Sequence, residues 1–224
     1  MKLQIIRFFE MLLGIISLCA GAALGIIADL GLTTSTGTSY ALAGALGIKV
    51  GSGMILLYGF FLLLQLMVLG KSFKLTAFIQ IVPVVLQGWI LNFFKYDFAP
   101  FLALSPQSYG ERFLVYVIGV VLISFGFTCT KNSRFANYPP ETFCAIVSER
   151  AGVRFGTGKI AMDFFYVAAS LALCFFFGMD YGVVREGTLI FAVVNGMLIN
   201  FFQPCVEKLF TKAEAAVQGK DIIE

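Results

Sequence analysis

The chain contains no histidine and few charged residues of any kind. Of its 224 residues only 13% are Asp, Glu, Lys or Arg, whereas 59% are hydrophobic. Soluble domains average about 25% charged and roughly 45–50% apolar residues, so much of this chain's surface must contact lipid. The lack of histidine excludes histidine-ligated metal sites and catalytic triads with a histidine base. We therefore expect a membrane protein that is not an enzyme and that holds neither a metal nor another cofactor.

Basic clusters, paired cysteines and nucleotide motifs are also missing. The 16 Lys and Arg form no dense run, so nothing points to nucleic-acid binding. The five cysteines include no CxxC pair, and four lie in or at the ends of apolar runs, where cysteine packs as a small hydrophobe. The segment 156–159, Gly-Thr-Gly-Lys, resembles a phosphate-binding loop, but Val153 and Ile160 stand where that motif needs Gly and Ser or Thr. ATP use is therefore not expected.

Six apolar stretches are long enough to cross a membrane. A transmembrane helix needs about 20 mostly apolar residues, and the candidates are 7–28, 53–70, 75–94, 112–131, 157–178 and 186–206. We predict an all-α, polytopic membrane protein that forms one domain over residues 1–224, with 207–224 as a cytoplasmic tail.

The sequence repeats itself within these stretches. The run Gly-Ile-Lys-Val-Gly-Ser-Gly at 47–53 is matched 105 residues later by Gly-Val-Arg-Phe-Gly-Thr-Gly at 152–158. The run Gly-Trp-Ile-Leu-Asn-Phe-Phe at 88–94 is matched 108 residues later by Gly-Met-Leu-Ile-Asn-Phe-Phe. We predict two copies of a three-helix unit, at about 7–94 and 112–206. Three crossings is an odd number, so the second copy would enter the membrane in the opposite direction, as an inverted repeat.

The distribution of Lys and Arg supports six crossings independently. Cytoplasmic loops are enriched in Lys and Arg, and with a cytoplasmic N-terminus twelve of the 16 fall in inner segments and four in outer ones. We therefore predict that both termini are cytoplasmic. The inner residues are Lys2, Arg7, Lys71, Lys74, Lys131, Arg134, Arg150, Arg154, Lys159, Lys208, Lys212 and Lys220, and the outer ones are Lys49, Lys95, Arg112 and Arg185.

A short segment follows the first crossing of each copy. Residues 36–47 are too few to span, and 141–152 carry Glu149 and Arg150 and would span badly. We interpret both as short helices that are re-entrant or lie at the membrane interface. If both crossed fully, there would be eight crossings and the copies would be parallel.

The stretch before each short segment is hydroxyl-rich or proline-rich. The candidates for solute binding there are Thr33, Thr34, Ser35 and Thr36 in copy one, and Asn137, Pro139 and Glu141 in copy two. Thr36 and Glu141 correspond by the 105-residue shift, and such residues can cap a helix start. The alternative to capping is that these residues bind the solute, because broken helices of inverted repeats commonly form a transporter's substrate site. Free N–H groups at a helix start would favour an anionic or carbonyl-bearing ligand, although Glu141 competes for them.

The segments 29–37 and 134–141, called the first and second break below, resemble an element of the YczE/YyaS/YitT family of bacterial membrane proteins, whose copies carry Leu-Gly-x-x-Pro-x-Asp after the first helix. In this chain the element reads Leu30-Gly31 with Thr34 and Thr36 in copy one, and Phe135-Ala136 with Pro139 and Glu141 in copy two. The resemblance covers nearly the whole chain. It implies a multi-pass protein of the bacterial plasma (inner) membrane with a role in transport, but the loss of the acid in copy one speaks against a mechanism that needs two acids.

Polar side chains inside the crossings are further candidates. Gln80, Gln87 and Asn195 either line a central pathway or hydrogen-bond helix to helix, which is worth about 0.6–2 kcal/mol. Asp163 either is functional or pairs with Lys159, four residues back on the same helix face. Because burial raises the pKa of a carboxylic acid, Glu141 and Asp163 are candidates for carrying a proton.

Two functions from different classes fit these patterns. The first is transport of an unidentified small-molecule solute by alternating access between the two copies. The second is a non-transporting scaffold, assembly or regulatory partner of another complex, and a wettable cavity at the centre distinguishes the two. Gly21 and Gly25 form a close-packing motif that suits contacts within the chain or between subunits, so a homodimer remains an open alternative.

Overall fold

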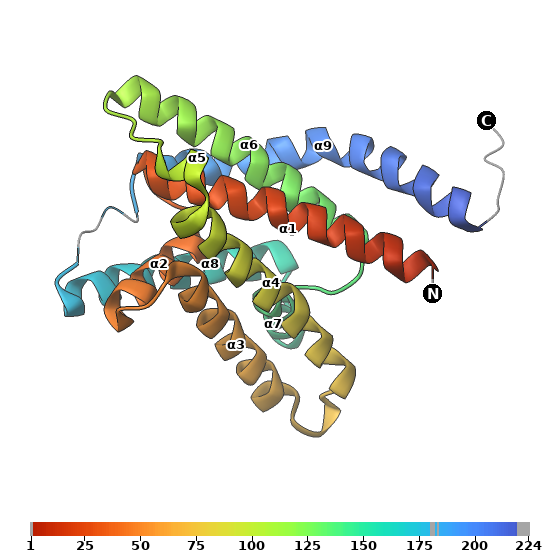
Figure 1. Ribbon diagram of the computed structural model, residues 1–224. Helices are drawn as coiled ribbons and strands as arrows, with labels where there is room; N and C mark the ends of the chain where they lie inside the picture. Colours follow the sequence, from red (N-terminus) through yellow and green to blue (C-terminus); the bar gives the residue numbers. More distant parts are fainter. Residues whose placement is uncertain (1, 180–181, 183, 219–224) are drawn as a thin grey trace.

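The computed structural model describes residues 2–179, 182 and 184–218, which form helices and short connections (Figure 1). The longer helices are α1 (Lys2–Ala28), α3 (Val50–Leu69), α4 (Ile81–Asn92), α6 (Tyr109–Ser133), α8 (Phe155–Phe177) and α9 (Glu186–Gln218). The shorter ones are α2 (Thr34–Leu46), α5 (Ala99–Leu102) and α7 (Pro139–Arg150). The 3₁₀ segments η1 (Gly70–Ser72) and η2 (Leu75–Gln80) and the π turn η3 (Phe93–Asp97) adjoin α3 and α4.

Six helical segments are long and apolar enough to cross a membrane, which confirms that prediction. They are Leu3–Ala28, Val50–Ser72, Leu75–Asp97, Tyr109–Ser133, Phe155–Phe177 and Glu186–Thr211. The short helices predicted at 36–47 and 141–152 are α2 and α7. Each begins two residues before its predicted start, and neither is among the six long apolar segments. The predicted tail starts within α9, and Lys220 and the side chain of Lys212 lie outside the described part of the chain.

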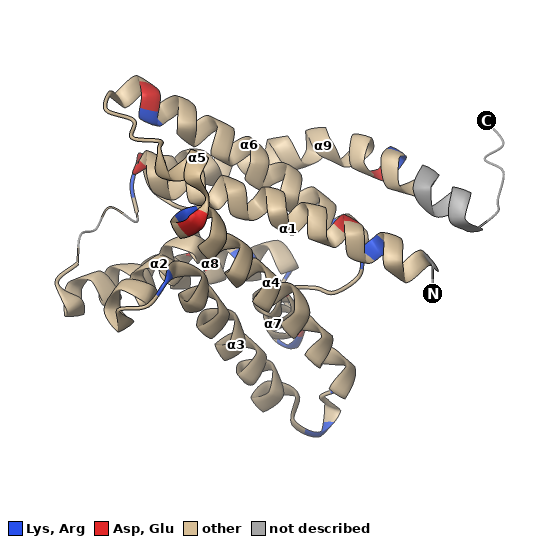
Figure 2. Cartoon of the chain, viewed as in Figure 1, with Lys and Arg blue, Asp and Glu red and all other residues tan. Residues whose placement is uncertain are grey.

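Charged residues are concentrated near the ends of the long helices, and most of their length carries none (Figure 2). Large apolar side chains are exposed instead, such as Phe175 and Phe176 on α8 and Leu189 and Val193 on α9. This distribution suits helices with lipid around their middle, where an unpaired charge is costly. α1 begins and α9 ends at the same end of the molecule (Figure 1), as six crossings require.

The most extensive helix contact is between α1 and α6, which cross at glycines. A Cβ atom at Gly126 would lie 2.6 Å from the carbonyl oxygen of Gly14, and one at Gly119 would lie 2.9 Å from that of Gly21. The Ser17 hydroxyl donates to the carbonyl oxygen of Leu122 at 2.8 Å. Small residues let two backbones approach within a membrane. Gly21 therefore packs within the chain, whereas a Cβ atom at Gly25 would meet Leu32 at 3.7 Å.

Local geometry recurs 105 residues apart at the ends of these two helices. α1 ends at Ala28 and α6 at Ser133, and each is followed by a non-glycine residue in the left-handed region, Asp29 with φ 52° and Arg134 with φ 50°. Such a residue ends a helix and turns the chain away from its axis. It opens the break that leads into α2 or α7.

The short helices pack across the molecule rather than only on their neighbours in sequence. α2 packs on α8, and α7 packs on α3. The main core accordingly combines apolar residues of both halves, such as Met54 and Phe61 with Tyr138 and Tyr166. The halves differ in one respect: α4 packs on α3 and α1, whereas α9 packs mainly on α6.

The glycine crossing predicts a selective loss of stability. Alanine at Gly126 must force α1 and α6 apart, because its Cβ atom would meet two backbone atoms of α1 at 2.6 Å. Overpacking of this kind costs about 1–3 kcal/mol, so we expect the thermal midpoint in detergent to fall by about 2–10 °C for Gly126→Ala. Gly59→Ala is the matched control, since nothing lies within 4 Å of its Cβ position. Equal midpoints for the two variants would contradict a tight crossing.

Candidate functional site

A cavity of about 40 Å³ lies between the two breaks. One water needs roughly 10–15 Å³ of such volume, so the cavity has room for a few waters or a small solute group. Tyr58, Gln87 and Tyr166 reach it from the middle of α3, α4 and α8. The polar residues that line it are Thr33, Ser35, Thr36, Tyr58 and Gln87 from the first half and Tyr138, Glu141, Lys159 and Tyr166 from the second.

Three buried side-chain atoms around this cavity lack hydrogen-bond partners. They are Gln87 Oε1 and the hydroxyls of Tyr138 and Tyr166, and these residues are 2%, 6% and 1% exposed. In the described part of the chain no other buried side-chain nitrogen or oxygen is left in this way. An unsatisfied buried polar group costs about 1–3 kcal/mol. Three of them around one cavity indicate an occupant that forms hydrogen bonds, either water or a ligand.

Thr33 is the N-cap of α2, so of the two alternatives for Thr36, capping and a functional role, capping is excluded. The Thr33 hydroxyl accepts from the Thr36 N–H at 3.3 Å and donates to the Thr36 hydroxyl at 2.8 Å. Thr36 is the third residue of the helix, because the extended backbone conformation ends at Thr33. Its side chain is buried and faces the cavity.

The second break starts its helix in a different way. Tyr138 precedes α7 without a side-chain cap, and Pro139 and Pro140 occupy the first two helical positions. Proline suits these positions because it has no N–H to satisfy. Glu141 is the third residue, in the same place as Thr36, so it too is not the cap. The start of α7 consequently offers few N–H donors to the anionic ligand that the sequence suggested.

Asp163 connects α8 to the first break. Its carboxylate accepts from Lys159 Nζ at 2.9 Å and from the Thr34 hydroxyl at 2.7 Å. The predicted pair with Lys159 is therefore present, and Thr34 points to Asp163 rather than into the cavity. This arrangement fixes the start of α2 against α8.

Gln80 and Pro139 belong to a buried contact that fixes the second break. Gln65 on α3 forms a reciprocal amide pair with Gln80 at 3.3 Å, and its Nε2 donates to the carbonyl oxygen of Pro139 at 2.8 Å. Asn195 accepts from the Ser124 hydroxyl at 2.9 Å and joins α9 to α6. Neither Gln80 nor Asn195 lines the cavity, and Asn137 is exposed away from it.

Of the predicted solute-binding residues, five reach the cavity: Thr33, Ser35, Thr36, Gln87 and Glu141. The sequence reasoning missed the phenols of Tyr58, Tyr138 and Tyr166. A signal was available, because Tyr166 stands where copy one has Phe61 and therefore adds a hydroxyl to an otherwise apolar position. It also missed Glu10, which is 1% exposed on α1 and accepts from Asn132 Nδ2 at 2.5 Å.

Glu141 is the acid of the central cavity. It is partly buried, and desolvation raises its pKa above the ordinary 4.5. Lys159 and Lys131 act in the opposite direction, because nearby positive charge favours the carboxylate. Desolvation is the larger effect, so Glu141 keeps its proton to higher pH than an exposed glutamate does.

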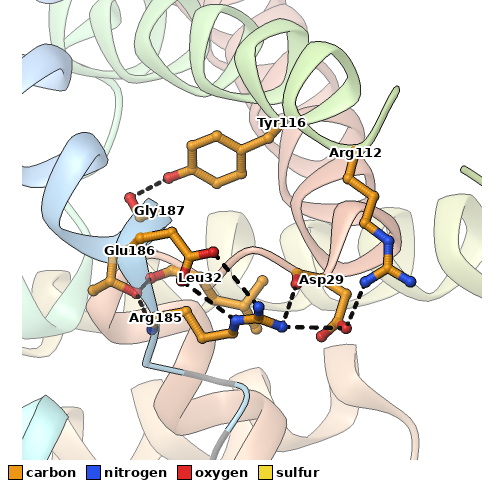
Figure 3. A network of polar contacts seen from close by, with 8 residues as sticks. Asp29, Leu32, Arg112, Tyr116, Arg185, Glu186 and Gly187 are labelled. Carbon is orange, nitrogen blue, oxygen red and sulfur yellow. Dashed lines mark hydrogen bonds and ion pairs between the residues drawn. The ribbon is translucent and has the colours of Figure 1, made fainter. Parts of the chain in front are cut away.

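An ionic network lies at the ends of α1, α6 and α9 (Figure 3). Asp29 pairs with Arg112 at 3.3 Å and with Arg185 at 3.5 Å, and Arg185 also donates to the Asp29 carbonyl oxygen at 2.9 Å. Arg185 further pairs with Glu186 at 3.5 Å. Because these side chains are between 37% and 57% exposed, each pair contributes about 0–1 kcal/mol.

Hydrogen bonds beside this network attach the start of α9 to the first break. The Gly187 N–H donates to the Leu30 carbonyl oxygen at 2.8 Å, and the Thr188 hydroxyl donates to that of Leu32 at 2.9 Å. The Tyr116 hydroxyl donates to the Gly187 carbonyl oxygen from α6 (Figure 3). A small void of about 10 Å³ lies between these contacts and the central cavity, and Thr33 and Thr36 line both spaces.

The chain belongs to a protein family whose model matches residues 5–204 and whose description is "Family of unknown function (DUF6198)". Comparisons with curated proteins and with solved structures give no match. The resemblance to the YczE/YyaS/YitT family stays a prediction.

The raised pKa of Glu141 predicts a pH-dependent stability. The folded state binds this proton more tightly than the unfolded chain, so the stabilisation is complete below the ordinary pKa of 4.5 and is lost as pH rises through the higher folded pKa. Thermal midpoints in detergent should therefore fall over this window in the unmodified protein. Glu141→Gln should remove that part of the slope, and Glu149→Gln, an exposed position on the same helix, should keep it. The same slope in all three proteins would show that Glu141 titrates normally.

Proposed function

We propose that this member of the DUF6198 family is a membrane transporter for a small solute, working by alternating access about the central cavity. The observation that carries the proposal is the set of unpartnered atoms of Gln87, Tyr138 and Tyr166 around one cavity. A scaffold gains nothing from unpaired polar groups in its interior, because each one costs about 1–3 kcal/mol. A transporter needs such groups, since its solute must find there the hydrogen bonds that it loses on leaving water.

We further propose that the two halves are inverted-topology repeats. The contacts of α1 with α6 support this, because a shift of 105 residues turns the pair Gly14–Gly126 into the pair Gly119–Gly21, which also exists. The Ser17 hydroxyl bonds to Leu122, the residue at its own position in the other copy. A twofold axis through that contact would produce both observations. Such repeats can exchange conformations and so give inward-open and outward-open states of similar energy.

Re-entrant helices are part of the same proposal. α2 and α7 are too short to span, yet their first turns line a cavity that residues in the middle of α3, α4 and α8 also line. Irregular backbone at membrane depth is tolerated where it is buried in protein or lines a cavity. The starts of α2 and α7 line the cavity, as this condition requires, whereas Arg134 and Asn137 of the second break are exposed.

The conformation described corresponds, in this proposal, to a state closed towards the outside. The start of α9 is docked on the first break through Gly187 and Thr188, and the pairs of Asp29 with Arg112 and Arg185 lie over it (Figure 3). Opening would separate α9 from the break and join the void to the central cavity. The ion pairs are weak enough to break, at about 0–1 kcal/mol each.

The proposed location is the bacterial plasma membrane, with both termini in the cytoplasm. Twelve of the 16 Lys and Arg would then lie in cytoplasmic segments or near them, which agrees with the positive-inside tendency. The structure is compatible with this topology, because α1 begins and α9 ends at the same end of the molecule (Figure 1). The resemblance to the YczE/YyaS/YitT family supports the bacterial setting.

Cysteine accessibility tests the transport proposal. Single cysteines at Ser35, Thr36, Pro140 and Glu141, in a chain whose own five cysteines are replaced, would be exposed to an impermeant thiol reagent from each side of membrane vesicles. We expect labelling of both breaks, with a reciprocal change between the sides when solute is added. Labelling requires water in the cavity.

Two further positions serve as controls. A cysteine at Ser39, which is 0% exposed and packs against Gly53, should stay unlabelled, and one at the exposed Gln107 should report a single side. If the four break positions behave like Ser39 from either side, the centre is dry. A scaffold or regulatory partner would then replace the transporter.

A further inference from the structure

The charge and lining of the central cavity select a class of solute. Building on the transport function proposed above, we propose that the site binds a small protonated amine in exchange for the proton of Glu141. The ammonium group would pair with the Glu141 carboxylate, and the proton of Glu141 would leave to water. The net charge of the site is the same before and after the exchange.

The first step of the argument is the charge balance. The charged side chains that line the cavity are Glu141 and Lys159. The Lys159 ammonium is already neutralised by Asp163 at 2.9 Å. The Glu141 side chain has no hydrogen bond or ion pair with any residue that the structure describes. Glu141 therefore either stays protonated or needs a cation beside it, because an unpaired carboxylate in a partly buried site is costly.

The second step is the hydrogen-bonding character of the lining. Gln87 Oε1 is an acceptor that lacks a donor, and the phenol oxygens of Tyr138 and Tyr166 can also accept. An ammonium group brings up to three N–H donors and can satisfy these atoms together with Glu141. The apolar part of the lining is aromatic at Tyr58, Phe127 and Tyr166 and aliphatic at Leu18, Ala22 and Ile123. Aromatic rings attract cations and accept a short alkyl chain.

The same features disfavour other solutes. An anion would meet the Glu141 carboxylate, and the start of α7 cannot compensate because Pro139 and Pro140 carry no N–H. A neutral solute brings no charge to the Glu141 carboxylate, which would then depend on Lys131 and on Lys159, already paired with Asp163. An inorganic cation such as Na⁺ would pair with Glu141 but has no apolar part to contact the apolar side chains of the lining. It serves as the competitor in the test.

Other titratable groups near Glu141 do not mimic this exchange. Lys159 and Asp163 are paired with each other, and thiols and phenols ordinarily lose protons only above about pH 8. The groups concerned are Lys131 on α6, Tyr58 on α3, Tyr138 in the break, Cys144 on α7, and Lys159, Asp163 and Tyr166 on α8.

The test is titration of the purified full-length protein in detergent with methylammonium, with heat and released protons measured at a series of pH values. We expect binding with up to one proton released per methylammonium, and an affinity that rises up to about tenfold per pH unit until Glu141 is ionised. Glu141→Gln should abolish the proton release and weaken binding about tenfold or more. Tyr166→Phe should weaken binding about 2–10-fold while the proton release persists. Glu149→Gln, exposed on the same helix, should match the unmodified protein.

Each failure has a separate meaning. If methylammonium does not bind, or if Na⁺ displaces it at equal concentration, the amine class is wrong, and labelling of both breaks would leave transport standing. If it binds with the same proton release after Glu141→Gln, the exchange at Glu141 is wrong. If it binds as expected but the breaks resist thiol reagents from both sides, the amine site stands and transport fails.

Discussion

The close crossing of α1 and α6 determines where the polar parts of this chain can meet. Glycines at 14, 21, 119 and 126 bring the two backbones together, and each helix then ends in a left-handed residue that opens a break. Because the helices are so close, the two breaks lie opposite each other, α2 reaches α8 and α7 reaches α3. The central cavity forms where the breaks face one another. Bulkier residues at the crossing would separate the breaks and remove the shared cavity.

Polar groups near the centre are of two kinds: some hydrogen-bond to other residues and fix the helices in place, and others have no partner and are available to a ligand. Asp163 holds the first break through Thr34, and Gln65 holds the second through the carbonyl oxygen of Pro139. These contacts are satisfied and fix the geometry. Gln87, Tyr138 and Tyr166 remain without partners in the space between. A rigid frame around unpaired groups is the arrangement that a binding site needs, because the groups are oriented before the ligand arrives.

Much of the fold followed from the sequence, whereas the site followed only in part. Apolar length and polar interruption depend on local composition, so the six apolar helices and the short helices α2 and α7 were predictable. Capping of α2 by Thr36 was one of two alternatives, and the cap is Thr33 instead, because the residue at which the helical backbone begins depends on how the break packs. Asn195 and Gln80 contact other helices instead of the cavity, since the direction in which a helical side chain points is set by tertiary contacts. The hydroxyl of Tyr166 was overlooked because tyrosine counts as a hydrophobic residue in a search for apolar stretches.

The most direct test of alternating access is a pair of spin-label distances, one across each end of the molecule. Labels at Lys49 and Gln107 report the end with the Asp29 network, and labels at Ser72 and Glu149 report the opposite end; all four residues are exposed. We expect two distances at each end, with opposite changes in population when Asp29→Asn weakens the network. Because this substitution removes the pairs with both Arg112 and Arg185, each worth about 0–1 kcal/mol, the effect should reach about thirtyfold at most. A single distance at each end, unchanged by this substitution and by added solute, would contradict alternating access.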